Sequence, residues 1–221
     1  MKFLDKYDVF IFDLDGLLID SLDKLSNALV QSVSKFANSS QLVSFQKYDI
    51  QNPGLSRFEK VDFFINSILK NNDIKPEIIL KIFDELSLEA RISSTLNPCI
   101  NELYEIYESK HWILLTNCDN QQLMHVANRF NLARIFGNNL VGTPPSKSSR
   151  AKEIRINNQG RSIISISDSE SDGELAEMNE FDFLFVEEFS RGNSDWKIKN
   201  YFSVQKLDEL LDLSLKVKFV K

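Results

Sequence analysis

The sequence predicts an α/β protein, with a mostly parallel sheet covered by helices on both faces and a helical subdomain inserted into it. Two observations predict this fold class. Short apolar runs of strand length recur along the chain and alternate with helical patterns. The first run ends near Phe12 and the second begins near His111, whereas the connection between two strands of such a sheet is normally much shorter.

Length and composition fit one large domain, or a core with a modest insertion. The chain has 221 residues, of which 43% are hydrophobic and 26% are charged. These values are close to the averages of globular proteins, so the chain can bury a core. With only 7 glycines and 5 prolines, it has no collagen-like or low-complexity character.

Charge and hydropathy disfavour several classes of partner. The formal net charge is -6, and the scattered basic residues form no footprint for nucleic acid or an anionic membrane surface. No apolar run approaches the ~20 residues that span a bilayer. Asp5 and Asp8 interrupt the region where a signal peptide would be apolar, and Cys99 and Cys118 are too few for a disulfide framework. We therefore expect a soluble cytoplasmic protein with no nucleic-acid or membrane partner.

Five strands are expected, with a helical cap domain between the first two. The strands cover Tyr7–Phe12, His111–Leu115, about Asn139–Val141, Ser162–Ser167 and Asp182–Val186. Three apolar patterns with helical spacing fill much of the first gap, and they extend from Leu22 to Phe36, from Phe58 to Leu69 and from Ile78 to Ala90. We predict that residues 19–93 form the cap domain and that residues 1–18 and 94–221 form the core.

Further helices are expected in the second part of the core. Pro98 suits the first turn of a helix that runs to about Ser109. Asp119 can cap the next helix, which carries Leu123 and Phe130. The tail YFSVQKLDELLDL is predicted to close the fold with a final helix, whose apolar face consists of Leu207, Leu210 and Leu211.

Polar side chains follow four of the apolar runs in a fixed order: a carboxylate pair, a hydroxyl, a lysine and a second carboxylate pair. They are Asp13 with Asp15, Thr116 with Asn117, Lys147, and Asp168 with Asp172. Open α/β sheets bind ligands at the carboxyl ends of their strands, so these groups can converge on one edge. An unpaired carboxylate at the end of a fully apolar strand is costly unless a cation compensates it.

This ordered set resembles the motifs of the haloacid dehalogenase-like superfamily, over essentially the whole chain. FDLDGLLIDS is similar to its first motif, LLTN to its second, Lys147 in GTPPSKS to its third and SDSESDGELAEMN to its fourth. The insertion lies where one subgroup carries a helical cap. The resemblance implies a Rossmann-like three-layer α/β/α core and Mg²⁺-dependent phosphoryl transfer.

The chemistry of phosphoryl transfer suggests a role for each group. The reaction needs an in-line nucleophile, a proton for the leaving oxygen and neutralisation of the phosphoryl charge. Asp13 can attack phosphorus and form an aspartyl-phosphate, while Asp15 can act first as general acid and then as general base. The remaining groups can hold the phosphoryl oxygens in the transition state, and they are Thr116, Asn117 and Lys147.

Mg²⁺ is the expected cofactor. It takes oxygen ligands and keeps several waters, so the Asp13 side chain, the Asp15 backbone carbonyl and Asp168 would suffice to bind it. Asp172 is either an outer metal ligand or an anchor for Lys147. Ser167 stands before Asp168 where many relatives have glycine, a departure that removes no chemical group.

One segment of the cap has loop chemistry instead of helical periodicity. It is Asn52-Pro53-Gly54-Leu55-Ser56-Arg57, in which Ser56 can cap the helix that follows. Arg57 either points its guanidinium group at a substrate anion or is an exposed first-turn residue. The segment looks like the cap loop of sugar-phosphate phosphatases and β-phosphoglucomutases of the superfamily.

The expected function is hydrolysis of a small phosphorylated metabolite, such as a sugar phosphate, by a monomer or weak homodimer. The nearest alternative is a phosphomutase, in which the phosphoryl group returns to the substrate. The cap entry, Asp20-Ser21-Leu22-Asp23-Lys24, lacks the histidine that β-phosphoglucomutases tend to carry, so hydrolysis is favoured. A non-catalytic binding protein is a third alternative, but it predicts a damaged motif and none is damaged.

Overall fold

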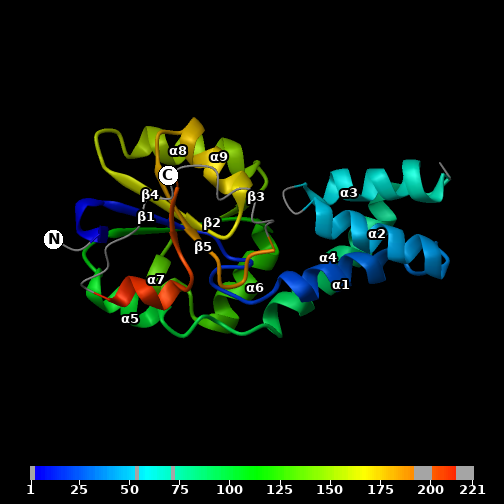
Figure 1. Cartoon of the computed structure of the whole chain (residues 1–221), viewed down its shortest axis with the longest axis horizontal. Helices are drawn as coiled ribbons and strands as arrows, with labels where there is room; N and C mark the ends of the chain where they lie inside the picture. Colours follow the sequence, from blue (N-terminus) through cyan, green and yellow to red (C-terminus); the bar gives the residue numbers. More distant parts are fainter. Residues whose placement is uncertain (1–2, 53–54, 71–72, 192–200, 213–221) are drawn as a thin grey trace. The chain divides into compact units, whose positions relative to one another are not determined.

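The structure, a computed structural model, describes residues 3–52, 55–70, 73–191 and 201–212. The chain divides into two units (Figure 1). The core comprises Met1–Asp20 and Thr95–Lys221, and the cap comprises Ser21–Ser94. The cap expected from the sequence, residues 19–93, begins two residues earlier and ends one residue earlier than this unit.

The described part of the core contains a six-stranded parallel sheet, so the predicted α/β fold class is confirmed. The strand order is β3-β2-β1-β4-β5-β6. The strands are β1 (Val9–Phe12), β2 (His111–Asp119), β3 (Leu140–Thr143), β4 (Ile163–Ser167), β5 (Asp182–Val186) and β6 (Phe202–Val204). Every residue of β1 is buried, because a central parallel strand is covered on both faces.

Helices cover both faces of the sheet (Figure 1). Helices α8 (Lys147–Asn157) and α9 (Glu170–Met178) lie on one face, and α5 (Ile100–Ile106) and α7 (Ala133–Phe136) lie on the other. The α6 helix (Asn120–Phe130) packs against β2 and β3, and Asp119 caps it as predicted. Alternate residues of β1 serve the two faces: Ile11 packs in the α8 and α9 layer, whereas Phe12 stacks on Trp112.

The tail corrects the sequence prediction. The expected final helix is present as the short 3₁₀ helix η4 (Leu207–Leu211), but the same segment begins with strand β6, which was not expected. The β6 strand pairs with β5, which therefore has strand partners on both sides. The Phe202 ring lies edge-on to Phe3 of the 3₁₀ helix η1 (Phe3–Lys6). These contacts are tertiary, and they determine the conformation of a segment that is too short to show a strand pattern.

The cap is helical and has its own hydrophobic core. Its elements are α1 (Leu22–Val33), α2 (Ser39–Gln51), α3 (Arg57–Phe63), the π-helical segment η2 (Phe64–Leu69) and α4 (Pro76–Ile92). The sequence analysis missed α2. Its buried residues are Phe45 and Asp49, so it lacks the apolar periodicity of the other helices, and Asn38 and Gln41 define its start through a capping box.

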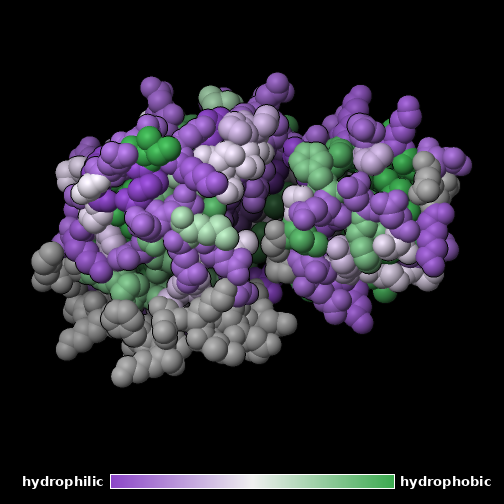
Figure 2. All heavy atoms as spheres, turned by 90° about the horizontal axis from the view of Figure 1, so that it is seen from above, coloured by the Kyte–Doolittle hydropathy of each residue, from purple (hydrophilic) through white to green (hydrophobic). Residues whose placement is uncertain are grey.

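Exposed apolar side chains are present at the surface of the described residues. None of their helices has the length and apolar character required to cross a bilayer. On the face drawn in Figure 2, hydrophobic residues lie in separate groups among hydrophilic ones. Exposed large hydrophobic side chains occur in both units, including Val43, Ile50, Phe58, Met124, Ile156 and Met178. Single apolar residues at the surface are ordinary in soluble domains.

Gly142 in β3 permits a close approach between β3 and β2. A Cβ atom at this position would lie 2.6 Å from the backbone oxygen of Cys118. We expect Gly142→Ala to lower the free energy of unfolding by about 1–3 kcal/mol, because the backbone must move to accept the methyl group. Urea denaturation of the variant and the wild type measures this loss. A loss below about 0.5 kcal/mol, the level of a neutral surface substitution, would contradict it.

Candidate active site

Asp13 lies at the carboxyl end of the central strand β1. Its backbone N–H donates to the carbonyl oxygen of Ile166 in β4 at 3.1 Å, so strand pairing continues up to this residue. The Asp13 side chain is 12% exposed. A nearly buried carboxylate is thus presented at the edge where open α/β sheets bind their ligands.

A tight turn follows Asp13 and fixes the position of Asp15. Gly16 has a φ of 84°, a left-handed conformation that glycine adopts without strain. The backbone N–H of Ile19 donates to the carbonyl oxygen of Leu14 at 3.0 Å, and that of Gly16 donates to Ile19 at 2.9 Å. The turn therefore holds Asp15, which is partly buried, two residues beyond Asp13.

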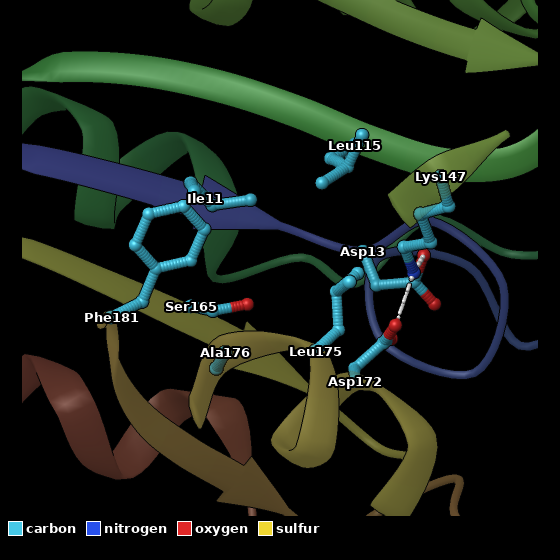
Figure 3. A pocket seen from close by; sticks show the side chains of 9 residues that line it. All are labelled: Ile11, Asp13, Leu115, Lys147, Ser165, Asp172, Leu175, Ala176 and Phe181. Atoms are coloured by element: carbon cyan, nitrogen blue, oxygen red, sulfur yellow. Dashed lines mark hydrogen bonds and ion pairs between the residues drawn. The ribbon is translucent and has the colours of Figure 1, made fainter. Parts of the chain in front are cut away.

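Lys147 bridges two carboxylates (Figure 3). Its Nζ donates to Oδ1 of Asp13 at 2.8 Å, and it lies 2.7 Å from Oδ1 and 2.8 Å from Oδ2 of Asp172. Lys147 is expected in the loop after β3, but the structure has it as the first residue of α8, directly after the N-cap residue Ser146. Three elements, β1, α8 and α9, therefore meet at one ammonium group.

Asp172 contacts Lys147 from the first turn of α9. Ser169 caps this helix by accepting a hydrogen bond from the backbone N–H of Asp172 at 3.3 Å. The Asp172 carboxylate also accepts a hydrogen bond from the hydroxyl of Ser167. Of the two alternatives that the sequence leaves open for Asp172, outer metal ligand or anchor for Lys147, the structure shows the contact of an anchor.

Asp168 follows β4 and is buried, with 6% of its surface exposed. Its backbone carbonyl accepts a hydrogen bond from the Ser190 hydroxyl at 2.7 Å. Burial raises the pKa of Asp168 well above its usual range, and the negative charges of Asp13 and Asp172 raise it further. The carboxylate therefore sits where its ionised form needs a compensating cation.

Burial and neighbouring charges also shift the pKa values of Asp13 and Lys147. Burial raises the pKa of Asp13 to about 7, although the nearby Lys147 opposes this shift. Burial by itself lowers the pKa of Lys147, but the charges of Asp13 and Asp172 outweigh it and hold that pKa above its ordinary value. Lys147 is therefore an ammonium group at neutral pH.

Thr116 and Asn117 lie within β2, although the sequence analysis expects the strand to end at Leu115. Because Phe12 pairs with Leu114, the register brings Thr116 to the same edge as Asp13. Thr116 is 1% exposed, and its Oγ1 accepts a hydrogen bond from the backbone N–H of Cys118 at 3.1 Å. This bond orients the hydroxyl and leaves its proton for another acceptor. Asn117 is exposed at the same edge.

Solved structures identify the fold. No family model and no curated protein matches the chain. A presumed phosphatase from Clostridium difficile superposes with a TM-score of 0.71 at 17% identity, covering 96% of this chain and 100% of that one. For a haloacid dehalogenase-like family hydrolase from Streptococcus pneumoniae the TM-score is 0.66 at 18% identity, and the coverage is 93% and 98%. The chain has the haloacid dehalogenase-like fold. A presumed β-phosphoglucomutase from Thermotoga maritima shares it, with a TM-score of 0.63, 16% identity and coverage of 92% and 96%.

The haloacid dehalogenase-like core brings most of the predicted site residues to one edge of the sheet. Asp13 and Asp172 both contact Lys147. The charge of Asp13 contributes to the raised pKa of Asp168, so these two carboxyl groups are neighbours. The strand register places Thr116 at the same edge. The remaining members of the set are Asp15 and Asn117, which the adjoining turn and strand carry to the same edge.

The charge balance of this edge fits a divalent cation. Two carboxylates, from Asp13 and Asp172, form ion pairs with the single ammonium of Lys147, and the charges of both act on the buried carboxyl group of Asp168. Among the described residues no second lysine or arginine pairs with them, so two negative charges stay uncompensated when all three ionise. No cluster of three or more His, Cys, Asp or Glu side chains in the described ranges is arranged to hold a metal. Mg²⁺ bound here would therefore rely on two carboxylates, a backbone carbonyl and water.

A small cavity of about 10 Å³ adjoins the ion pairs (Figure 3). Asp13, Lys147 and Asp172 line its polar end, and its apolar walls include Ile11 and Phe181. A space of this size holds about one water molecule. It is too small for a metabolite, so it belongs to the packing around the charged groups and does not form a substrate pocket.

Arg57 lies in the cap, at the first position of α3. Ser56 caps this helix, as predicted, in a capping box with Glu59. Nη1 of Arg57 lies 3.0 Å from Oδ1 of Asp84 in α4, and the Arg57 side chain is 20% exposed. Arg57 is therefore tied to a neighbouring helix of the cap, which neither sequence alternative included. Pro53 and Gly54, which precede it, lie outside the described residues.

Sequence reasoning missed two hydroxyl groups that contact the site residues. Ser167 bonds to the Asp172 side chain, and Ser190 bonds to the Asp168 backbone. The signal for Ser167 is weak: buried hydroxyls usually have a hydrogen-bond partner, but β4 contains two buried serines, Ser165 and Ser167, and the sequence does not show which of them bonds to a site residue. No local pattern marks Ser190, which lies in the loop after β5.

Proposed function

We propose that this protein is a Mg²⁺-dependent phosphatase, which hydrolyses a small phosphorylated metabolite through an aspartyl-phosphate on Asp13. One observation carries the proposal: the nearly buried carboxylate of Asp13 and the buried one of Asp172 share the ammonium of Lys147, and the buried carboxyl group of Asp168 lies beside them without an ion pair to any described residue. Such a group can orient a nucleophile and also bind a phosphate dianion with its counter-cation. The presumed phosphatase among the similar structures supports the same reaction class.

Asp13 acts as the nucleophile. The hydrogen bond from Lys147 is made to Oδ1, and among the described residues it is the only hydrogen bond to this carboxylate. Oδ2 therefore stays available to attack phosphorus and form the acyl phosphate. The Lys147 ammonium holds the carboxylate in one orientation and lies within reach of the phosphoryl oxygens, where it stabilises the charge of the transition state.

Asp15 moves the proton. Its position two residues beyond Asp13, on a turn that Gly16 permits and backbone hydrogen bonds hold, suits a carboxyl group that protonates the leaving alcohol oxygen. The resulting carboxylate then takes a proton from the water that attacks the acyl phosphate, which releases phosphate and regenerates Asp13. When bound, Mg²⁺ supplies the positive charge that the carboxylates lack and orients the phosphoryl group. Thr116 and Asn117 donate to the phosphoryl oxygens.

Phosphate release from a panel of phosphorylated metabolites, with Mg²⁺ or with EDTA, tests this function. Mg²⁺-dependent release from one class of substrate is the expected result. Isomerisation of a sugar phosphate without release would indicate a phosphomutase, the activity presumed for one similar structure. Hydrolysis is favoured because the cap entry carries no histidine, and its Lys24 side chain donates to the Ser93 carbonyl within the cap. The absence of any turnover would contradict both enzymatic assignments.

Substitution of Asp168 is expected to weaken Mg²⁺ binding. In Asp168→Ala, activity at low Mg²⁺ should fall at least about tenfold and recover in part as Mg²⁺ rises, since the variant loses one of two ligand carboxylates. Isothermal titration calorimetry measures the change in Mg²⁺ affinity directly. Glu170→Ala, which removes an exposed carboxylate two residues along, serves as the matched control. If high Mg²⁺ restores no activity, Asp168 does more than bind the ion.

Substitution of Arg57 tests its proposed role in specificity. We expect Arg57→Ala to lower kcat/KM for the physiological substrate by about one to two powers of ten, the effect of one charge-assisted hydrogen bond. Hydrolysis of p-nitrophenyl phosphate should barely change, because this ester offers the guanidinium nothing to bind. Asp84→Asn is the control, since it breaks the Arg57 ion pair but keeps the cation. Equal losses in both variants, or on both substrates, would assign Arg57 to the stability of the cap.

A further inference from the structure

We propose that Ser167 is a positioning residue, which locks Asp172 against Lys147 and so keeps the ammonium directed at Asp13. The inference rests on the proposed function, because it concerns the groups that would carry out phosphoryl transfer. The sequence analysis gives Ser167 no role and notes only that it stands where many relatives have glycine.

Among the described residues, the Ser167 hydroxyl has one hydrogen-bond partner, the Asp172 carboxylate. Ser167 is the last residue of β4 and is 1% exposed, and its Oγ bonds to Oδ2 of Asp172. An ionised carboxylate only accepts hydrogen bonds, so the hydroxyl must donate its proton to Asp172. Oδ2 of Asp172 therefore receives two donors, Ser167 Oγ and Lys147 Nζ, while Oδ1 lies 2.7 Å from Nζ.

The second donor matters because both partners have rotational freedom. A carboxylate held only by an ammonium can turn about its terminal torsion and still satisfy the charge, and lysine is a point charge on a flexible four-carbon stem. The Ser167 hydroxyl is fixed by a strand in the centre of the sheet, so it determines the plane of the Asp172 carboxylate. This plane in turn determines where Nζ of Lys147 lies relative to Oδ1 of Asp13, 2.8 Å away.

The same strand provides a matched control. Ser165 lies two residues before Ser167, so its side chain projects from the same face of β4. It is also buried, with 9% exposed, and it lines the small cavity (Figure 3). Its hydroxyl makes no hydrogen bond with any other described residue. Ser165→Ala therefore removes the same group from the same strand without touching the Asp172 carboxylate.

Steady-state kinetics give the first test. We expect Ser167→Ala to lower kcat about tenfold, with KM within about twofold of wild type, because Lys147 acts on the transition state more than on the bound substrate. Ser165→Ala should keep kcat within about twofold. Equal kcat values in the two variants would overturn the proposal. If Ser167→Ala fails to fold, Ser167→Cys gives the same test, since a thiol has a similar shape but donates weakly.

The ammonium resonance of Lys147 gives a second test that needs no activity. In a ¹H–¹⁵N spectrum of the free protein, assigned by its loss in Lys147→Ala, this buried ammonium should be protected from exchange. Protection should fall in Ser167→Ala and persist in Ser165→Ala, with Lys60, buried against Asp49 in the cap at 2.7 Å, as internal reference. Unchanged protection in Ser167→Ala would refute the positioning role. If the spectra behave as expected while no substrate is hydrolysed, the proposed function fails and the positioning role stands.

Discussion

Replacing Asp13 by asparagine is expected to reduce turnover below about 1% of the wild-type value, because loss of a covalent nucleophile costs several powers of ten. The amide has nearly the same shape as the carboxylate, and its oxygen can still accept the hydrogen bond from Lys147 that Oδ1 accepts at 2.8 Å. The fold should therefore survive the substitution. Phosphate release measured with the best substrate of the panel gives the residual rate.

Asp8 offers a matched control for this experiment. It precedes β1 at the opposite end from Asp13, is exposed, and accepts hydrogen bonds from Ser162. Asp8→Asn makes the same chemical change at the other end of β1 and should leave turnover unchanged. Residual activity above about 1% in Asp13→Asn, with Asp8→Asn fully active, would count against Asp13 as the nucleophile.

Lys147→Ala is expected to lower kcat by about two to three powers of ten, the effect of removing one group that stabilises transition-state charge. Added Mg²⁺ should not restore the rate, because bulk cation cannot replace a charge held between Asp13 and Asp172. Kinetics over a range of Mg²⁺ concentrations measure both effects. This response distinguishes Lys147 from Asp168, whose loss Mg²⁺ should offset in part.

The control for Lys147 comes from the same helix. Lys152 lies in α8 and is exposed, so Lys152→Ala should retain full activity. Removal of Lys147 also leaves two buried carboxylates without their cation, a change that typically destabilises a protein by about 3–5 kcal/mol. Circular dichroism must therefore show that the variant is folded at the assay temperature. Full activity in folded Lys147→Ala would remove it from the site and move the role to another lysine.

Much of the fold could be predicted because its strands are buried on both faces. The run Val9–Phe12 is continuously apolar and forms the central strand, and the long interval before β2 contains the helical cap. The tail could not be predicted in the same way. The pairing of β6 with β5 is a long-range contact, and a three-residue strand carries almost no periodicity. Helix α2 was missed for a similar reason, since one of its two buried residues is charged.

The candidate site shows the same division between local pattern and tertiary contact. Asp13 and Asp168 could be predicted as site residues from the sequence alone. Each follows a strand predicted to be buried, and a buried carboxylate needs a positive charge to compensate it. The sequence leaves open whether Asp172 is a metal ligand or an anchor for Lys147, because the answer depends on how α8 and α9 place these two side chains. Their contact in the structure is the one expected of an anchor. The ion pair between Arg57 and Asp84 joins two helices of the cap. The two residues are far apart in the sequence, so no local pattern predicts their contact.

The central claim is that Asp13 carries the phosphoryl group, and beryllium fluoride tests it most directly. This reagent mimics a phosphoryl group bound to a carboxylate, so a crystal structure of the protein with beryllium fluoride and Mg²⁺ shows which side chain accepts the group. The account predicts beryllium bonded to a carboxylate oxygen of Asp13, with the fluorides facing Lys147 and Thr116. Beryllium bonded to Asp15, Asp168 or any other side chain would contradict it.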